Sequence, residues 1–142
     1  MPDSPSLPIN LFLSDLREIE NGKLCIVVTE GQAGGAAKPI GDLGLTGNKI
    51  LIMPDSRSFV LLWDSYVALS VRDESFVIPD DDNPGGSFVE RVSSSYLRFI
   101  RETSIAVDVL QKPLRYWQIA CLNHAIDVVS TVAPSLGESK QD

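Results

Sequence analysis

Residues 58–78 are densely apolar, and the pattern changes along this stretch. Residues 59–63 are all apolar, so a strand formed there would be apolar on both faces. In residues 66–72, Val67, Leu69 and Val71 alternate with Tyr66, Ala68, Ser70 and Arg72, so one face of a strand here would be more polar. The pattern predicts a strand in the interior of a β-sheet, followed by a second strand that has one face towards solvent.

Other short apolar segments have the length and the flanking glycine or proline residues of strands. Residues 24–29 form an uninterrupted apolar and β-branched run, which is typical of a strand buried on both faces. Further strands are predicted at residues 49–53, 76–78, 88–92 and 116–121. We expect the strand at 88–92 to lie antiparallel to the one before it.

Three segments have apolar residues at helical spacing, each after a residue that can cap a helix. The N-terminal segment follows Asn10, the middle segment (residues 96–103) follows three serines, and the C-terminal segment follows Asn123. Residues 105–110 are compatible with either a helix or a strand. The apolar positions of the two terminal segments are Ile9, Phe12, Leu13, Leu16 and Ile19, and Leu122, Ala125, Ile126, Val129 and Val132.

Together these elements predict an α+β fold. We expect a mixed or mainly antiparallel β-sheet of about five to seven strands, with an N-terminal, a middle and a C-terminal helix. Residues 9–133 are expected to form a single domain, between a flexible N-terminus (1–8) and a flexible C-terminal tail (134–142). A chain of 142 residues can bury its own core without a metal or a disulfide.

Composition and charge narrow the classes of function. Hydrophobic residues make up 44% and charged residues 22% of the chain, as in globular domains. Nineteen acidic against twelve basic side chains give a net charge of −7, which disfavours nucleic-acid and anionic membrane partners. The N-terminus does not have the pattern of a signal peptide, and no apolar run is long enough for a membrane helix. We therefore expect a cytoplasmic protein.

Two groups of residues contain side chains that can carry chemistry. Cys25 and Cys121 are distant in sequence, so we expect buried thiols, no metal site and no cofactor. Cys121, His124 and Asp127 contain the residue types of a thiol nucleophile, its base and an orienting acid. An enzyme built on these three residues is one hypothesis, although such groups usually come from separate elements.

Residues 30–48 contain six glycines and suggest a ligand loop as an alternative. A glycine-rich loop after a strand can hold phosphate, and Gly34, Gly35 and Lys38 would be its candidate residues. Lys38 is followed by Pro39, however, so the pattern of a P-loop is not met. We expect a surface loop with several turns, and a small-ligand-binding or regulatory domain remains an alternative function.

The acidic segment favours a third class, a non-catalytic protein-binding domain. Residues 64–82 carry six acids and one base, and opposite charges orient protein partners. In its sharpest form, this hypothesis describes a bacterial immunity-type inhibitor that covers a basic toxin or nuclease. The candidate contact residues are Tyr66, Asp73, Glu74, Asp80, Asp81 and Asp82.

Overall fold

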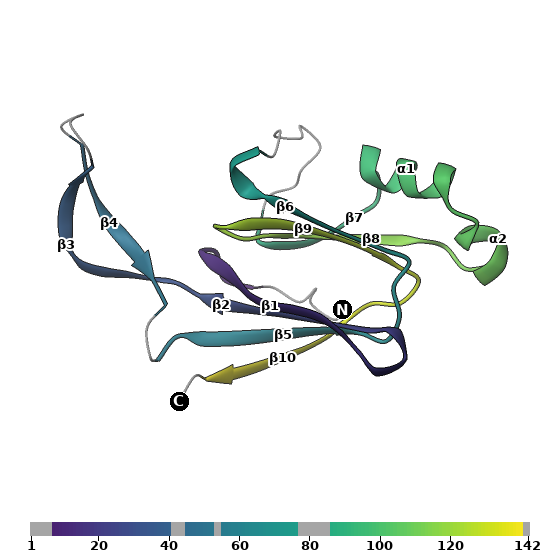
Figure 1. The fold of residues 1–142 in the computed structure, drawn as a ribbon, viewed down its shortest axis with the longest axis horizontal. Coiled ribbons are helices and arrows are strands. Elements are labelled where there is room, and N and C mark those ends of the chain that lie inside the picture. The colour runs from purple at the N-terminus through teal and green to yellow at the C-terminus, as the bar shows by residue number, and fades with distance from the viewer. Residues whose placement is uncertain (1–6, 41–44, 53–54, 77–85, 141–142) are drawn as a thin grey trace, which may run out of the picture.

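The computed structural model describes residues 7–40, 45–52, 55–76 and 86–140, and all statements below concern these residues. The chain has an α+β fold in which two antiparallel sheets of four strands each lie face to face (Figure 1). Two helices accompany them among the described residues. No helix in these ranges is both long enough and apolar enough to cross a bilayer.

The first sheet has the strand order β1-β2-β5-β10. Its members are β1 (Leu11–Ile19), β2 (Lys23–Glu30), β5 (Arg57–Trp63) and β10 (Ser135–Lys140). A short 3-10 turn, η1 (Glu20–Gly22), joins β1 to β2, and Asn21 within it has a φ of 61°. Left-handed backbone is tolerated by asparagine better than by most residues, which suits this position to a tight turn.

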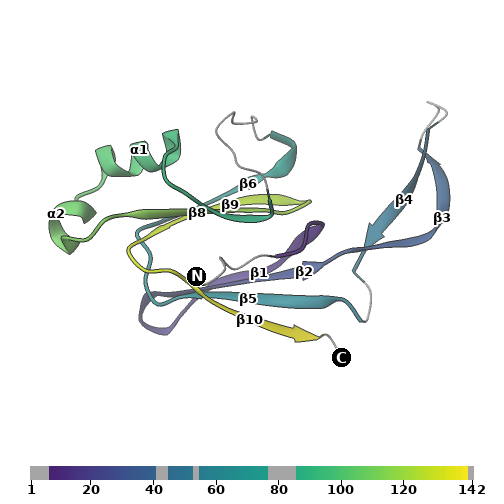
Figure 2. The same ribbon diagram turned by 180° about the vertical axis from the view of Figure 1, so that it is seen from behind.

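The second sheet has the strand order β6-β9-β8-β7. Its members are β6 (Ala68–Asp73), β7 (Phe88–Arg91), β8 (Arg115–Ala120) and β9 (His124–Ser130). The 3-10 turn η2 (Glu74–Phe76) follows β6. Helices α1 (Ser95–Thr103) and α2 (Ala106–Leu110) lie on the side of this sheet that faces away from the first sheet (Figures 1 and 2).

A β-hairpin formed by β3 (Gln32–Ile40) and β4 (Leu45–Leu51) extends beyond one end of the two sheets (Figure 1). The two strands pair with each other, with a register shift between Gly34 and Lys38. Because β3 follows β2 and β4 precedes β5, the hairpin prolongs two neighbouring strands of the first sheet.

The main core fills the space between the two sheets. It includes Leu24, Ile26 and Val28 of β2, Phe59, Leu61 and Trp63 of β5, and Trp117, Ile119, Ile126 and Val128 of the second sheet. Trp63 and Trp117 meet edge to face, with their ring centroids 5.9 Å apart. This contact joins the central strands of the two sheets.

A second core lies between the second sheet and α1. Leu97 and Ile100 of α1 pack against Tyr116 of β8 and Val129 of β9. The Ser94 side chain accepts a hydrogen bond from the Leu97 N–H and so caps the start of α1. As a result, the second sheet is covered on both faces where α1 lies over it.

Several predictions are confirmed. The strands predicted at 24–29, 59–63, 88–92 and 116–121 correspond to β2, β5, β7 and β8, and the alternating segment becomes β6. The middle helix is α1, and the ambiguous segment 105–110 contains α2. The strand predicted at 49–53 overlaps β4. Among the described residues β7 pairs with β8, and most of the strand predicted before it, at 76–78, lies outside them.

The predicted N-terminal helix is wrong, because this segment forms β1. A β-bulge interrupts the register between Leu13 and Asp15. A bulge inserts one extra residue, so core-facing positions run 11, 13, 16 instead of keeping a strict period of two. Leu13 and Leu16 both pack against the main core. Their spacing of three residues is what imitated a helical pattern.

The predicted C-terminal helix is also wrong, because this segment forms β9. Residues 125–130 are all buried, since β9 lies in the interior of a sheet that is covered on both sides. The apolar residues fall in the pairs Ala125–Ile126 and Val128–Val129 without alternation, and such a pattern fits a helix and a buried strand equally well. Asn123, expected as a helix cap, lies instead in the turn between β8 and β9.

The number of strands also differs from the prediction. Instead of one sheet of five to seven strands, the described residues form two four-stranded sheets and a separate hairpin. The glycine-rich segment expected to be a loop supplies most of β3 and β4. Ser135–Lys140, within the segment expected to be a flexible tail, form β10 and pair with β5. Of the strand predicted at 76–78, Phe76 belongs to η2, and residues 77–85 lie outside the described residues.

The core position of Leu61 generates a stability prediction. Leu61 is fully buried between the sheets, whereas its neighbour Leu62 lies on the opposite face of β5 and is only partly buried. We expect Leu61→Ala to lower the free energy of unfolding by about 2–5 kcal/mol, because it leaves a cavity. Leu62→Ala is the matched control, and urea denaturation of the two variants should show the smaller loss for it. Equal losses would contradict this assignment of the core face.

Candidate functional site

Four exposed residues at the end of β6 and in η2 form a surface that we call the acidic rim: Val71, Asp73, Glu74 and Phe76. Phe76 is 82% exposed and Val71 43% exposed, and the two acidic side chains also face solvent. Asp73 Oδ1 accepts a hydrogen bond of 2.9 Å from the Ser75 N–H. An aspartate that bonds to the backbone two residues ahead favours a turn, which explains why β6 ends here.

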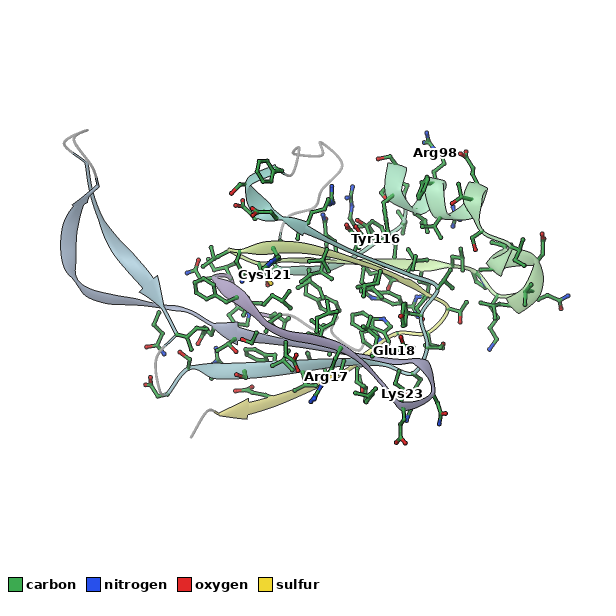
Figure 3. The ribbon with its side chains drawn as sticks, viewed as in Figure 1. Arg17, Glu18, Lys23, Arg98, Tyr116 and Cys121 are labelled. Atoms are coloured by element: carbon green, nitrogen blue, oxygen red, sulfur yellow. The ribbon has the colours of Figure 1, made fainter. Side chains whose placement is uncertain are left out.

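A buried carboxylate lies beside the acidic rim, on the outer face of the second sheet. Asp127 of β9 has a side chain that is 1% exposed, and Arg72 Nη2 donates to its Oδ2 over 3.0 Å. The Tyr116 hydroxyl donates to Asp127 Oδ1. Figure 3 shows Tyr116 on this outer face, beneath α1. Both carboxylate oxygens are therefore bonded, as a buried charge requires.

Further polar and aromatic groups extend this network. Arg91 Nη1 lies 3.5 Å from Gln118 Oε1, and its guanidinium carbon lies 5.9 Å from the centre of the Tyr116 ring. Tyr96 of α1 packs on Tyr116, with the ring centroids 5.6 Å apart. Arg72, whose side chain is 47% exposed, links this network to the acidic rim.

Electrostatics keep the two tyrosines neutral at ordinary pH. Burial raises the pKa of Tyr116, and the hydrogen bond to Asp127 and the negative charge of Asp127 raise it further. The pKa of Tyr96 is also raised, first by burial and then by the charge of Asp127. The Tyr116 phenol thus remains a hydrogen-bond donor. The network holds Arg72 in place rather than offering a proton for transfer.

The structure does not assemble Cys121, His124 and Asp127 into a catalytic triad. Cys121 is buried in the main core, between the sheets (Figure 3), and burial raises the pKa of its thiol to about 12. The Nδ1 atom of His124 is buried, and no described residue forms a hydrogen bond with it. His124 and Asp127 are three residues apart on one strand, so their side chains point to opposite faces of the sheet.

Tyr66 is not brought together with the other predicted contact residues. It precedes β6, packs partly against the main core, and donates a hydrogen bond of 3.1 Å to Glu18 Oε2 of β1. Burial is the largest cause of the raised pKa of Tyr66, and Glu18 raises this pKa further. Asp73 lies at the other end of β6, roughly 20 Å away for a strand that rises about 3.3 Å per residue.

Some of the other predicted site residues lie outside the residues that the structure describes. Asp80, Asp81 and Asp82 fall in residues 77–85, which are not described. Gly34, Gly35 and Lys38 lie in β3, where the backbone of Lys38 pairs with Gly47 of β4. Among the described residues, no group of three or more His, Cys, Asp and Glu side chains is placed to hold a metal ion.

Some residues of the site were missed from the sequence. The exposure of Val71 and Phe76 was hidden because each belongs to an apolar segment. Arg72 could have been found from the sequence, because it alternates with the apolar residues of its strand and so indicates a polar outer face. The pairing of Tyr116 with Asp127 had no such signal, because it depends on which residues of β8 and β9 lie opposite each other.

Comparison of the chain with protein-family models, curated proteins and solved structures found no match.

The network around Asp127 predicts an asymmetry between its two tyrosines. Tyr116→Phe removes a hydrogen bond to a buried carboxylate, so we expect a loss of about 1–3 kcal/mol in the free energy of unfolding. Tyr96→Phe is the matched control, because no described residue forms a hydrogen bond with the Tyr96 hydroxyl. Chemical denaturation at pH 7 measures both. Similar losses for the two variants would show that the bond to Asp127 does not stabilise the fold.

The buried thiol of Cys121 predicts a pH dependence. Because its pKa is raised from 9.0 to about 12, folding disfavours the thiolate. The stabilisation is complete below about pH 9 and is lost as pH rises towards 12. The stability difference between the wild type and Cys121→Ala should therefore decrease with pH in urea titrations from pH 8 to about 10.5. A difference that stays constant over this range would contradict burial of the thiol.

Proposed function

We propose that this protein is a non-catalytic protein-binding domain that engages a basic partner at the acidic rim. The observation that carries the proposal is the exposure of Phe76, at 82%, beside the exposed carboxylates of Asp73 and Glu74. An exposed aromatic side chain loses contact with water when a partner covers it, and such residues often dominate binding energy. The neighbouring carboxylates would orient the basic groups of the partner.

The distribution of charge supports a basic partner. Residues 64–82 carry six of the nineteen acidic side chains and only one base, and the net charge of the chain is −7. A concentrated negative potential accelerates encounter with a positively charged surface and rejects negatively charged ones. Arg72, the base in this segment, bonds to Asp127 and so leaves the rim acidic.

In its sharpest form, the proposal describes an immunity-type inhibitor in bacteria that covers the basic surface of a toxin or nuclease. In such a complex Asp73 and Glu74 would pair with lysine or arginine side chains that otherwise contact phosphate groups. Phe76 would occupy an apolar recess between them. The small size and acidic charge of the chain are what support this form.

Charge reversal at the rim tests the proposal. Asp73→Lys/Glu74→Lys and Phe76→Ala should each weaken partner binding about tenfold or more, because rim contacts are lost or repelled. All three residues are exposed, so circular dichroism and thermal unfolding should remain close to wild type. Binding is measured by affinity capture with the tagged protein, followed by calorimetry with each captured partner.

The matched control is Glu102→Lys/Asp108→Lys, which makes the same change in net charge on the exposed surface of α1 and α2. Binding by this control should be close to wild type, and binding to the wild type should weaken as salt increases. If the rim variants and the control bind alike, the rim is not the binding surface and the proposal fails.

A further inference from the structure

The strand that leads to the acidic rim, β6, has an open edge among the residues that the structure describes. In the second sheet it pairs with β9 on one side and occupies the end of the strand order. An edge strand presents unpaired N–H and C=O groups that can bond to an added strand. The directions of these groups along β6 follow from the register of the sheet.

A hydrogen bond in the turn between β8 and β9 shows which residues of β9 bond to β8 and which bond to β6. The Cys121 N–H donates to the His124 carbonyl over 2.8 Å, so this pair is hydrogen-bonded. Hydrogen-bonded and non-hydrogen-bonded pairs alternate in an antiparallel ladder. Even-numbered residues of β9 therefore bond to β8, and odd-numbered residues such as Asp127 bond to β6.

The same reasoning fixes the free groups of β6. Asp127 lies opposite Ser70, so even-numbered residues of β6 bond to β9. The bond from the Glu74 N–H to the Asn123 carbonyl continues this order. The backbone groups of Leu69, Val71 and Asp73 consequently point away from β9. No described residue forms a backbone hydrogen bond with them on that side.

Two of the other sheet edges are less able to accept a strand. At β1, the Leu122 N–H donates to the Leu11 carbonyl. The Asn123 side chain accepts from the Leu13 N–H over 2.9 Å and donates to its carbonyl. These bonds and the β-bulge interrupt this edge of the first sheet between Leu11 and Asp15. At the far edge of the second sheet, β7 has only four residues.

The remaining edge strand, β10, differs from β6 in charge. Its six residues include one acid, Glu138, and one base, Lys140. Beside β6, by contrast, exposed Asp73 and Glu74 flank the strand end, and Val71 and Phe76 offer apolar contact. An extended basic segment would match both the backbone and the charge of β6.

We infer that the basic partner binds by adding an extended segment as a new strand to the open edge of β6. The segment would alternate lysine or arginine with apolar residues. Its backbone would bond to Leu69, Val71 and Asp73, and its basic side chains would lie near Asp73 and Glu74. This inference rests on the proposed function, since it specifies how the partner of the acidic rim is recognised.

The test uses a capped eight-residue peptide of alternating lysine and valine, and the same peptide with glutamate in place of lysine. Val71→Pro removes an N–H on the open edge without removing a bond to β9, which edge strands tolerate. Val71→Thr retains this N–H and is the matched control. We expect the lysine peptide to bind the wild type, and to bind Val71→Pro about tenfold more weakly than Val71→Thr, which also changes the Val71 side chain but keeps the N–H. The glutamate peptide should not bind.

Amide hydrogen exchange provides a second measurement that needs no variant. When the lysine peptide saturates the wild type, the amides of Leu69, Val71 and Asp73 should exchange more slowly, whereas those of Ser70 and Arg72 should change little. The inference is overturned if these three amides are not protected, if folded Val71→Pro binds like Val71→Thr, or if no binding occurs up to about 1 mM peptide at low salt.

These outcomes separate the two proposals. Loss of partner binding in Asp73→Lys/Glu74→Lys, without protection of the β6 amides, leaves the acidic rim as a binding surface and removes strand addition. Partner binding that is insensitive to that charge reversal removes the proposed function itself.

Discussion

The fold depends on the burial of β9 from both sides. Residues 125–130 are all buried, because the first sheet covers one face of the strand and the polar network and α1 lie over the other. Asp127 is the one charged residue in this run, and it remains stable there because Tyr116 and Arg72 bond to both of its oxygens. Because Asp127 needs this bond, Arg72 must lie beside it on β6. The bond therefore holds the end of β6, where the acidic rim begins.

The sequence was sufficient to predict elements whose pattern is local. The strands β2 and β5 are apolar runs bounded by turn residues, and α1 has a serine cap and helical spacing. It was insufficient where tertiary contacts determine the pattern. The bulge in β1 shifted the core-facing residues by one position, and burial of β9 on both faces removed any strand alternation. The strand β10 was missed because a polar edge strand is held by backbone hydrogen bonds, which do not depend on side-chain hydrophobicity.

The same distinction applies to the candidate site. Asp73 and Glu74 were predicted from charge alone, and the structure places both at an exposed strand end. Tyr66 was assigned to this surface because it lies on the more polar face of the predicted strand, but β6 is extended and separates Tyr66 from Asp73. The hypothesis of a site at Cys121, His124 and Asp127 likewise relied on their closeness in sequence. Close spacing on a strand places neighbours on alternating faces, and Asp127 bonds to Tyr116 and Arg72 instead.

An open edge such as that of β6 is normally a risk, because two copies of a protein can pair through it. Here the acids at the rim counter that risk. Two copies that approached through β6 would bring the exposed acids Asp73 and Glu74 of both chains to one interface, and each chain carries a net charge of −7. The edge of β1 also carries exposed acids, Asp15 and Glu18, and bonds from residues 122 and 123 occupy its first residues, Leu11 and Leu13. The charge that opposes the pairing of β6 with a second copy is the same charge that would attract a basic strand. In the proposed function, protection from self-pairing and selection of a partner would therefore have one physical cause.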